Sequence, residues 1–191
     1  MKLSKGKPLD RYGLRVRPKK EIPNEFAWII QAFIIFMAKL VELRKLSKEF
    51  YKAYPHNEFP EMESKLGRPY VVLLVEINNI KFAIPLRTNI RHSYCYKFKT
   101  SDRKTESSTG IDFSKAVVIS KDNYLGEETD INDKEYLELQ EKAFFIINKF
   151  KKYVFDYISF KKNGGNEYIA RRYKFSTLKY FDEFLLNQHN Y

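Results

Sequence analysis

YVVLLVEINNIKFAIP, residues 70–85, is the stretch that predicts the fold most directly. Aliphatic and β-branched residues fill positions 70–77, a composition that favours a buried strand. Asn78-Asn79 favours a tight turn, because Asn tolerates positive φ, and residues 80–84 supply a second strand. The two strands predict a hairpin. Since Pro85 cannot donate a ladder hydrogen bond, we expect regular pairing to stop near it or its strand to lie at an edge.

Several further elements follow from hydrophobic spacing and capping residues. We expect a short strand at 39–43, then a helical turn with Phe50, Tyr51 and Tyr54, and another strand at 116–119. Asn132 or Asp133 can cap a long helix whose apolar residues recur at helical spacing and which ends by 163–165. A final short helix can be capped by Ser176. Residues 61–69 and 100–110 are polar and are expected to form loops.

Composition limits the class of protein. A chain of 191 residues with 43% hydrophobic content can bury one good core, so we expect one folded domain. The aromatic fraction of 16% argues against a disordered chain. A formal charge of +11 favours a polyanionic partner, nucleic acid before a membrane surface.

The residue content and spacing of the chain exclude several chemistries. The single cysteine, Cys95, excludes an intrachain disulfide and suits the cytoplasm. The three histidines are far apart and follow no zinc spacing, so we expect no metal. No P-loop, Rossmann or kinase pattern appears, so we expect no cofactor. The acids Asp112, Glu127, Glu128 and Asp130 are expected to be solvated or capping residues in turns rather than metal ligands.

The beginning of the chain differs from the rest. Residues 1–25 are basic, contain Gly and Pro, and are typical of a tail. The uncharged run at 26–38 is too short to cross a bilayer, which disfavours a membrane-anchored protein. It predicts a buried helix, unless Met37 is the natural first residue and the preceding residues are translated upstream sequence. We therefore divide the chain into an extension, 1–36, and a folded domain, 37–191.

The densest polar and basic segment follows the hairpin, where residues 86–93 should be displayed at a strand end. Metal-free RNA cleavage needs a group that deprotonates the ribose 2′-hydroxyl, donors that stabilise the phosphorane and an acid for the leaving oxygen. The segment offers guanidinium, hydroxyl, amide, imidazole and ammonium groups for these tasks. They belong to Arg87, Thr88, Asn89, Arg91, His92, Ser93, Lys97 and Lys99.

The same segment also admits a purely structural interpretation. Tyr94, Tyr96 and Phe98 alternate and can form one face of a strand, while Lys97 and Lys99 face water. A second basic and aromatic patch has the same ambiguity. Its tyrosines can stack on unpaired bases, or they can belong to the apolar stripe of a core helix with a charged outer face. This patch comprises Lys149, Lys151, Lys152, Tyr153, Lys161, Lys162, Arg171, Arg172, Tyr173 and Lys174.

Two strings, VEINNIKFAIPLRTNIRH at 75–92 and GIDFSKAVVI at 110–119, resemble the ToxN/AbiQ/TenpN toxins of type III toxin–antitoxin systems, and TenpN most closely. The resemblance runs from about Met37 to the C-terminus. In that family a strand pair delivers a Ser/Thr-containing segment to the active site, and Thr88 occupies the matching place. Arg91 stands where ToxN has a nearby lysine, and Asn89 departs from its Thr-Ser pair. Tyr51 is similar in position to an early active-site tyrosine.

The resemblance implies an α+β fold, a compact domain with a twisted antiparallel β-sheet packed by helices and related in shape to the Kid/MazF toxins. It implies a cytoplasmic, metal-independent endoribonuclease that leaves a 2′,3′-cyclic phosphate and a 5′-hydroxyl, without a cofactor. Together with the side-chain chemistry of the segment, this predicts that the catalytic residues are Thr88, Arg87, Arg91 and His92. The residues expected to bind RNA are Tyr51, Asn89, Ser93, Lys97, Lys99, Lys115, Lys151, Lys152, Tyr153, Arg171 and Arg172.

The implied partners are target RNAs and a repeated pseudoknot RNA. The pseudoknot RNA would inhibit the toxin, be processed by it and join it in a closed ring, as part of abortive phage infection. The alternative function is a non-catalytic basic RNA-binding module, for which the two patches would suffice and Thr88 would only hold a phosphate. The chemistry of the products formed from a test RNA distinguishes the two.

Overall fold

The computed structural model describes residues 41–62, 70–102 and 108–187. The predicted extension at 1–36, the 26–38 run and Met37 lie outside these residues. Within them, seven strands form one antiparallel sheet of order β4-β5-β3-β2-β1-β7, and β6 pairs with β3 beside this path. The strands are β1 (Leu43–Leu46), β2 (Val71–Ile77), β3 (Ile80–Arg87), β4 (Cys95–Lys97), β5 (Gly110–Asp112), β6 (Val117–Val118) and β7 (Leu125–Glu128).

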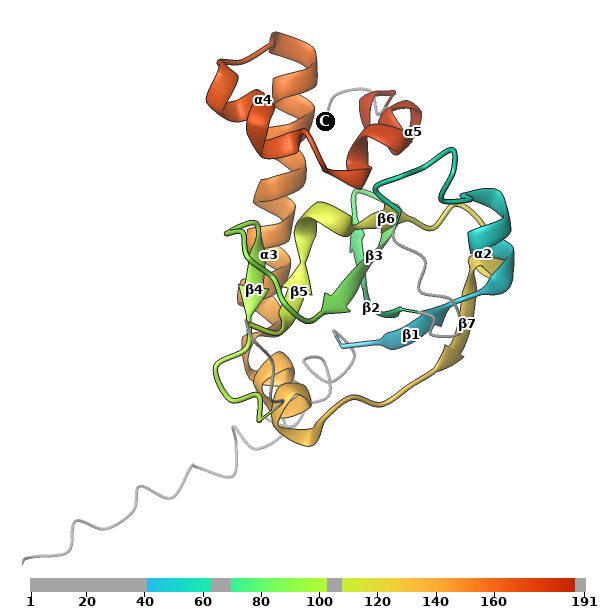
Figure 1. The fold of residues 1–191 in the computed structure, drawn as a ribbon, viewed down its shortest axis with the longest axis vertical. Helices are drawn as coiled ribbons and strands as arrows, with labels where there is room; N and C mark the ends of the chain where they lie inside the picture. Colours follow the sequence, from blue (N-terminus) through green and yellow to red (C-terminus); the bar gives the residue numbers. More distant parts are fainter. Residues whose placement is uncertain (1–40, 63–69, 103–107, 188–191) are drawn as a thin grey trace, which may run out of the picture. The chain divides into compact units, whose positions relative to one another are not determined.

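Helices flank this sheet, and the α+β prediction is confirmed. Figure 1 shows the long helix α3 running beside β4 and β5, while α2 lies at the other end near β7. The helices are α2 (Lys48–Ala53), α3 (Asp133–Asn163), α4 (Glu167–Tyr173) and α5 (Asp182–Leu186), with short 3-10 turns η1 (Phe113–Lys115), η2 (Asp122–Tyr124) and η3 (Thr177–Phe181). Among the described residues, no helix is long and apolar enough to span a membrane.

The predicted hairpin is formed by β2 and β3. Asn78 and Asn79 both adopt positive φ, 50° and 62°, as the tight turn requires. The pairing runs without a break from Ile77 opposite Ile80 to Val72 opposite Pro85. The expectation for Pro85 is met in part: the pairing with β2 ends at Pro85, but β3 continues to Arg87 and lies in the middle of the sheet rather than at an edge. On its other side β3 pairs with β6 at Phe82 and Ala83, and with β5 from Leu86 onward, so Pro85 lies between the two pairings.

Helix α3 is the second predicted element that the structure confirms. The Asn132 side chain accepts hydrogen bonds from the N–H groups of Lys134 and Glu135 at its start. Gly164 ends it with φ of 76°, a conformation that glycine adopts without strain. The helix joins the core through Phe150, whose ring lies 5.3 Å from that of Phe82 and 5.6 Å from that of Phe113 between centroids.

Other elements differ from the predictions in position or were not expected. The first strand, β1, spans Leu43–Leu46 rather than 39–43, of which residues 39 and 40 lie outside the described part. Ser176 caps a 3-10 turn that continues into α5. Strand β7 and helix α4 were not predicted. Each is short, and β7 contains Gly126 and two exposed acids, which gives it little strand pattern.

Candidate active site

The pairing of β3 with β5 builds the centre of the candidate site. Arg87 lies opposite Gly110, so its side chain reaches the buried carboxylate of Asp112 on the neighbouring strand. The two atoms Arg87 Nη1 and Asp112 Oδ2 are 2.5 Å apart. Strand β4 approaches β5 so closely that a Cβ on Gly110 would meet the Tyr96 carbonyl oxygen at 1.9 Å. Only glycine permits this three-strand contact.

Asp112 also holds His92 and Ser114. Its Oδ1 accepts hydrogen bonds from the Ser114 hydroxyl at 2.7 Å and from the Ser114 N–H at 3.0 Å, which caps η1. His92 Nε2 lies 3.3 Å from Asp112 Oδ2 and 3.4 Å from Ser114 Oγ. Burial raises the pKa of Asp112, but the His92 and Ser114 hydrogen bonds and the charges of His92 and Arg87 outweigh it, so the pKa lies below its usual value. Asp112 is therefore an anionic orienting group.

The His92 ring is fixed from its face as well as its edge. It stacks on Tyr94 with 5.9 Å between centroids, and the guanidinium of Arg172 covers the Tyr94 ring at 5.1 Å. The other ring nitrogen, Nδ1, is buried and has no hydrogen-bond partner among the described residues. An imidazole held in this way has a set orientation and one unused nitrogen.

Thr88 and Asn89 follow β3 in a bend. Asn89 is exposed and has a φ of 59°, so its backbone makes the change of direction. Thr88 is half-buried, and its hydroxyl makes no hydrogen bond within the described residues. Of the predicted catalytic residues, Arg87 and His92 thus meet at one buried carboxylate, Thr88 follows Arg87 in the bend, and Arg91 is exposed.

A cationic groove opens next to His92, between β4 and α3. It is an open depression of about 880 Å³. No acidic residue lines its described walls, which are formed by Arg91, His92, Ser93, Cys95, Tyr96, Lys97, Lys99, Lys142, Phe145 and Lys149. The predicted RNA-binding residues Ser93, Lys97 and Lys99 therefore share a surface with Arg91. Lys142, Phe145 and Lys149 were not predicted there, although their spacing of three and four residues places them on one helix face.

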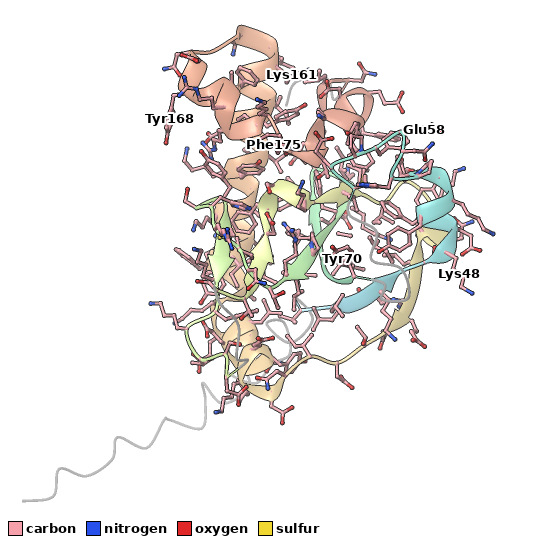
Figure 2. The ribbon with its side chains drawn as sticks, viewed as in Figure 1. Lys48, Glu58, Tyr70, Lys161, Tyr168 and Phe175 are labelled. Carbon is pink, nitrogen blue, oxygen red and sulfur yellow. The ribbon has the colours of Figure 1, made fainter. Side chains whose placement is uncertain are left out.

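Tyr51 and Lys115 lie at a different place, a small apolar pocket that Arg87 also lines. The Tyr51 hydroxyl accepts a hydrogen bond from the N–H of Tyr70 at 3.2 Å. Tyr70, which is labelled in Figure 2, directly precedes β2 in the sequence. Lys115 Nζ donates to the carbonyl oxygen of Phe175 at 3.2 Å. The structure thus places Arg87 between this pocket and Asp112.

The second basic patch is mostly neutralised or buried. Tyr153 is 1% exposed, its hydroxyl contacts Ser176, and its ring lies in the core, so the expectation that it stacks on RNA was wrong. Ion pairs join Lys152 and Arg172 to Asp156, and Arg171 to Glu167. Lys151 is exposed and lies over the Phe155 ring. The tyrosines of the helix follow its apolar stripe, which is the structural alternative named above.

The expectation for the acidic residues also needs correction. Asp112 caps η1 as expected, but it is fully buried rather than solvated. Glu127 and Glu128 are solvent-exposed as expected, but they lie in strand β7 rather than in a turn, and they pair with Lys45 and Arg44 of β1. Within the described ranges, no three His, Cys, Asp or Glu side chains are grouped so that they could hold a metal ion. The sequence did not indicate that Asp112 belongs to the site, because its partners His92 and Arg87 are 20 and 25 residues away.

Comparison with known proteins gives one informative match. No protein-family profile matches the chain, and no curated protein matches it. A solved structure from work on bacterial type III toxin–antitoxin systems, concerning selective toxin inhibition by a non-coding RNA pseudoknot, superposes with a TM-score of 0.54. The two sequences are 17% identical, and the superposition covers 78% of this chain and 99% of the other. The chain is similar in fold to a type III toxin. This supports the resemblance found in the sequence at the level of fold.

Proposed function

We propose that the protein is a metal-independent endoribonuclease toxin of a type III toxin–antitoxin system. The observation that carries the proposal is the position of His92, which is oriented by buried Asp112 and also lines the cationic groove. A phosphodiester in the groove would therefore lie next to an oriented imidazole and to the Arg91 side chain, and Arg87 contacts the same Asp112 carboxylate as His92. The similarity in fold to a type III toxin points to the same function.

The chemistry would be a transesterification. The ribose 2′-oxygen attacks the adjacent phosphorus, the bond from phosphorus to the 5′-oxygen breaks, and a proton passes to that oxygen. The products are a 2′,3′-cyclic phosphate and a 5′-hydroxyl. Arg87 and Arg91 would stabilise charge on the phosphorane, and the Thr88 hydroxyl would hydrogen-bond the phosphate or the attacking hydroxyl. His92 would move the proton, while Asp112 keeps the ring oriented, as the carboxylate does in a catalytic triad.

The partners follow from the same proposal. The solved toxin is inhibited by a non-coding RNA pseudoknot. For this chain we propose a repeated pseudoknot RNA that inhibits the toxin, is processed by it, and joins it in a cyclic RNA–protein assembly. Release of the toxin in the cytoplasm during phage infection would then arrest the host. A short tandem repeat in the DNA just upstream of the coding region would support this arrangement.

The deciding experiment is incubation of the full chain with an end-labelled RNA in EDTA, with the products tested for a cyclic phosphate. We expect cleavage to persist under chelation and the upstream product to carry the cyclic phosphate. Binding without any cleavage would favour the non-catalytic RNA-binding module, for which the groove alone suffices. Cleavage that vanishes on chelation would contradict the metal-independent mechanism.

A further inference from the structure

The groove between β4 and α3 carries a positive charge that the described residues do not neutralise. Arg91, Lys97, Lys99 and Lys142 make no ion pair with the described residues. The contrast with the second basic patch is informative, because there Lys152, Arg171 and Arg172 each have a carboxylate partner. Uncompensated cations that line one depression attract a polyanion that can follow it.

The groove also contains an exposed aromatic ring. Phe145 is 57% exposed, and its ring meets that of Tyr96 edge-on, with 6.2 Å between centroids. It lies between Lys142 and Lys149 along α3, so a cation flanks it on each side. An aromatic face between cations suits an unpaired base whose two neighbouring phosphates contact the lysines. A duplex cannot use the ring in this way, because its bases are already stacked on each other.

The two walls of the groove are held at a fixed spacing by buried Glu138. This α3 carboxylate accepts hydrogen bonds from the Tyr96 hydroxyl at 2.7 Å and from the N–H groups of Lys99 and Thr100, at 2.9 Å and 2.8 Å for the nearer oxygen. Lys149 Nζ adds a second link by donating to the Cys95 carbonyl oxygen at 2.9 Å. Because both walls are fixed before a ligand arrives, binding need not order them.

We infer that this groove binds an unpaired RNA segment, with Phe145 stacking on a base and Lys142 and Lys149 contacting the adjacent phosphates. The inference rests on the proposed function, since the groove would lead the strand to His92. It assigns to α3 a part in substrate binding. It also makes single-stranded RNA, rather than duplex, the substrate class of the site.

The test uses binding rather than cleavage, so that it does not depend on catalysis. The probe is a short unstructured 2′-O-methyl oligoribonucleotide, which cannot be cleaved through its 2′-oxygen, compared with a 2′-O-methyl duplex of the same length. We expect Phe145→Ser to weaken binding of the unpaired probe by roughly tenfold and to leave duplex binding unchanged. Phe144→Ser is the matched control, because Phe144 is 65% exposed on the same helix but does not line the groove.

A second pair of variants tests the phosphate contacts. Lys142→Gln should reduce the slope of log affinity against log salt concentration by about 0.7, the value for one lost phosphate contact on a single strand. Lys52→Gln, an exposed lysine of α2 outside the groove, should leave the slope unchanged. The inference is overturned if each groove variant behaves like its control, or if Phe145→Ser weakens duplex binding equally. Such a result alongside intact cleavage would leave the proposed function standing.

Discussion

Arg87 and Asp112 are 25 residues apart in the chain, yet Arg87 Nη1 lies 2.5 Å from the fully buried Oδ2 of Asp112. Asp112→Asn removes the charge that balances Arg87. We expect it to lower the free energy of unfolding by about 3 kcal/mol, because it breaks an ion pair to a fully buried carboxylate. Urea denaturation measures this. Asp122→Asn is the control, since Asp122 pairs with Lys81 at the surface and should change stability by less than about 0.5 kcal/mol.

The lowered pKa of Glu138 determines how the stability of the fold should depend on pH. Burial raises its pKa, but hydrogen bonds from Thr100, Tyr96 and Lys99 outweigh this and lower the pKa to about 2. A carboxylate with a lowered pKa stabilises the fold above its ordinary value near 4.5, and the contribution is lost as the pH falls toward 2. We expect Glu138→Gln to unfold at lower urea concentration at neutral pH and to lose less stability on acidification. Glu141→Gln, on the exposed side of α3, should follow the wild type at both pH values.

Substitution of Thr88 should affect RNA cleavage much more than RNA binding. Its hydroxyl has no hydrogen bond within the described chain, so it can engage a phosphate or a 2′-hydroxyl. We expect Thr88→Ala to slow cleavage by on the order of 100-fold and to abolish toxicity, with antitoxin-RNA binding largely intact. Thr88→Ser keeps the hydroxyl and should retain most of the activity. Normal cleavage by Thr88→Ala would remove this residue from the catalytic assignment.

Substitutions of Arg91 and Arg87 should have similar effects on RNA binding and cleavage but different effects on the stability of the fold. Both Arg91→Ala and Arg87→Ala are expected to weaken RNA binding and cleavage together, because a guanidinium contacts phosphate in the ground state and in the transition state. Arg91 is exposed, so its loss should leave the midpoint of thermal unfolding unchanged. Loss of Arg87 removes the guanidinium partner of buried Asp112 and should lower that midpoint. A thermal melt beside the cleavage assay checks this, and equal midpoints would contradict the structural role of Arg87.

The elements that sequence reasoning predicted are those specified by neighbouring residues. Asn78-Asn79 between apolar runs, and Asn132 and Gly164 at the ends of α3, carry their signals within a few positions. The site was predicted only in part, because Arg87 and His92 were found by composition whereas Asp112 depends on the register of β3 against β5. That register is a tertiary property. Tyr153 shows the converse, since a tyrosine between lysines on a helix fits a core stripe and an RNA surface equally well until the packing is known.

The two-residue turn at Asn78 and Asn79 determines which face of the sheet each side chain of β3 occupies. Side chains along a strand point alternately to the two faces of the sheet, so a register shift of one residue between β2 and β3 would reverse the face of every residue of β3. Arg87, at the far end of that strand, would then point away from Asp112. An insertion of one residue at the turn could therefore preserve a hairpin of the same length and still disconnect the guanidinium from its carboxylate, at a point that no RNA needs to touch.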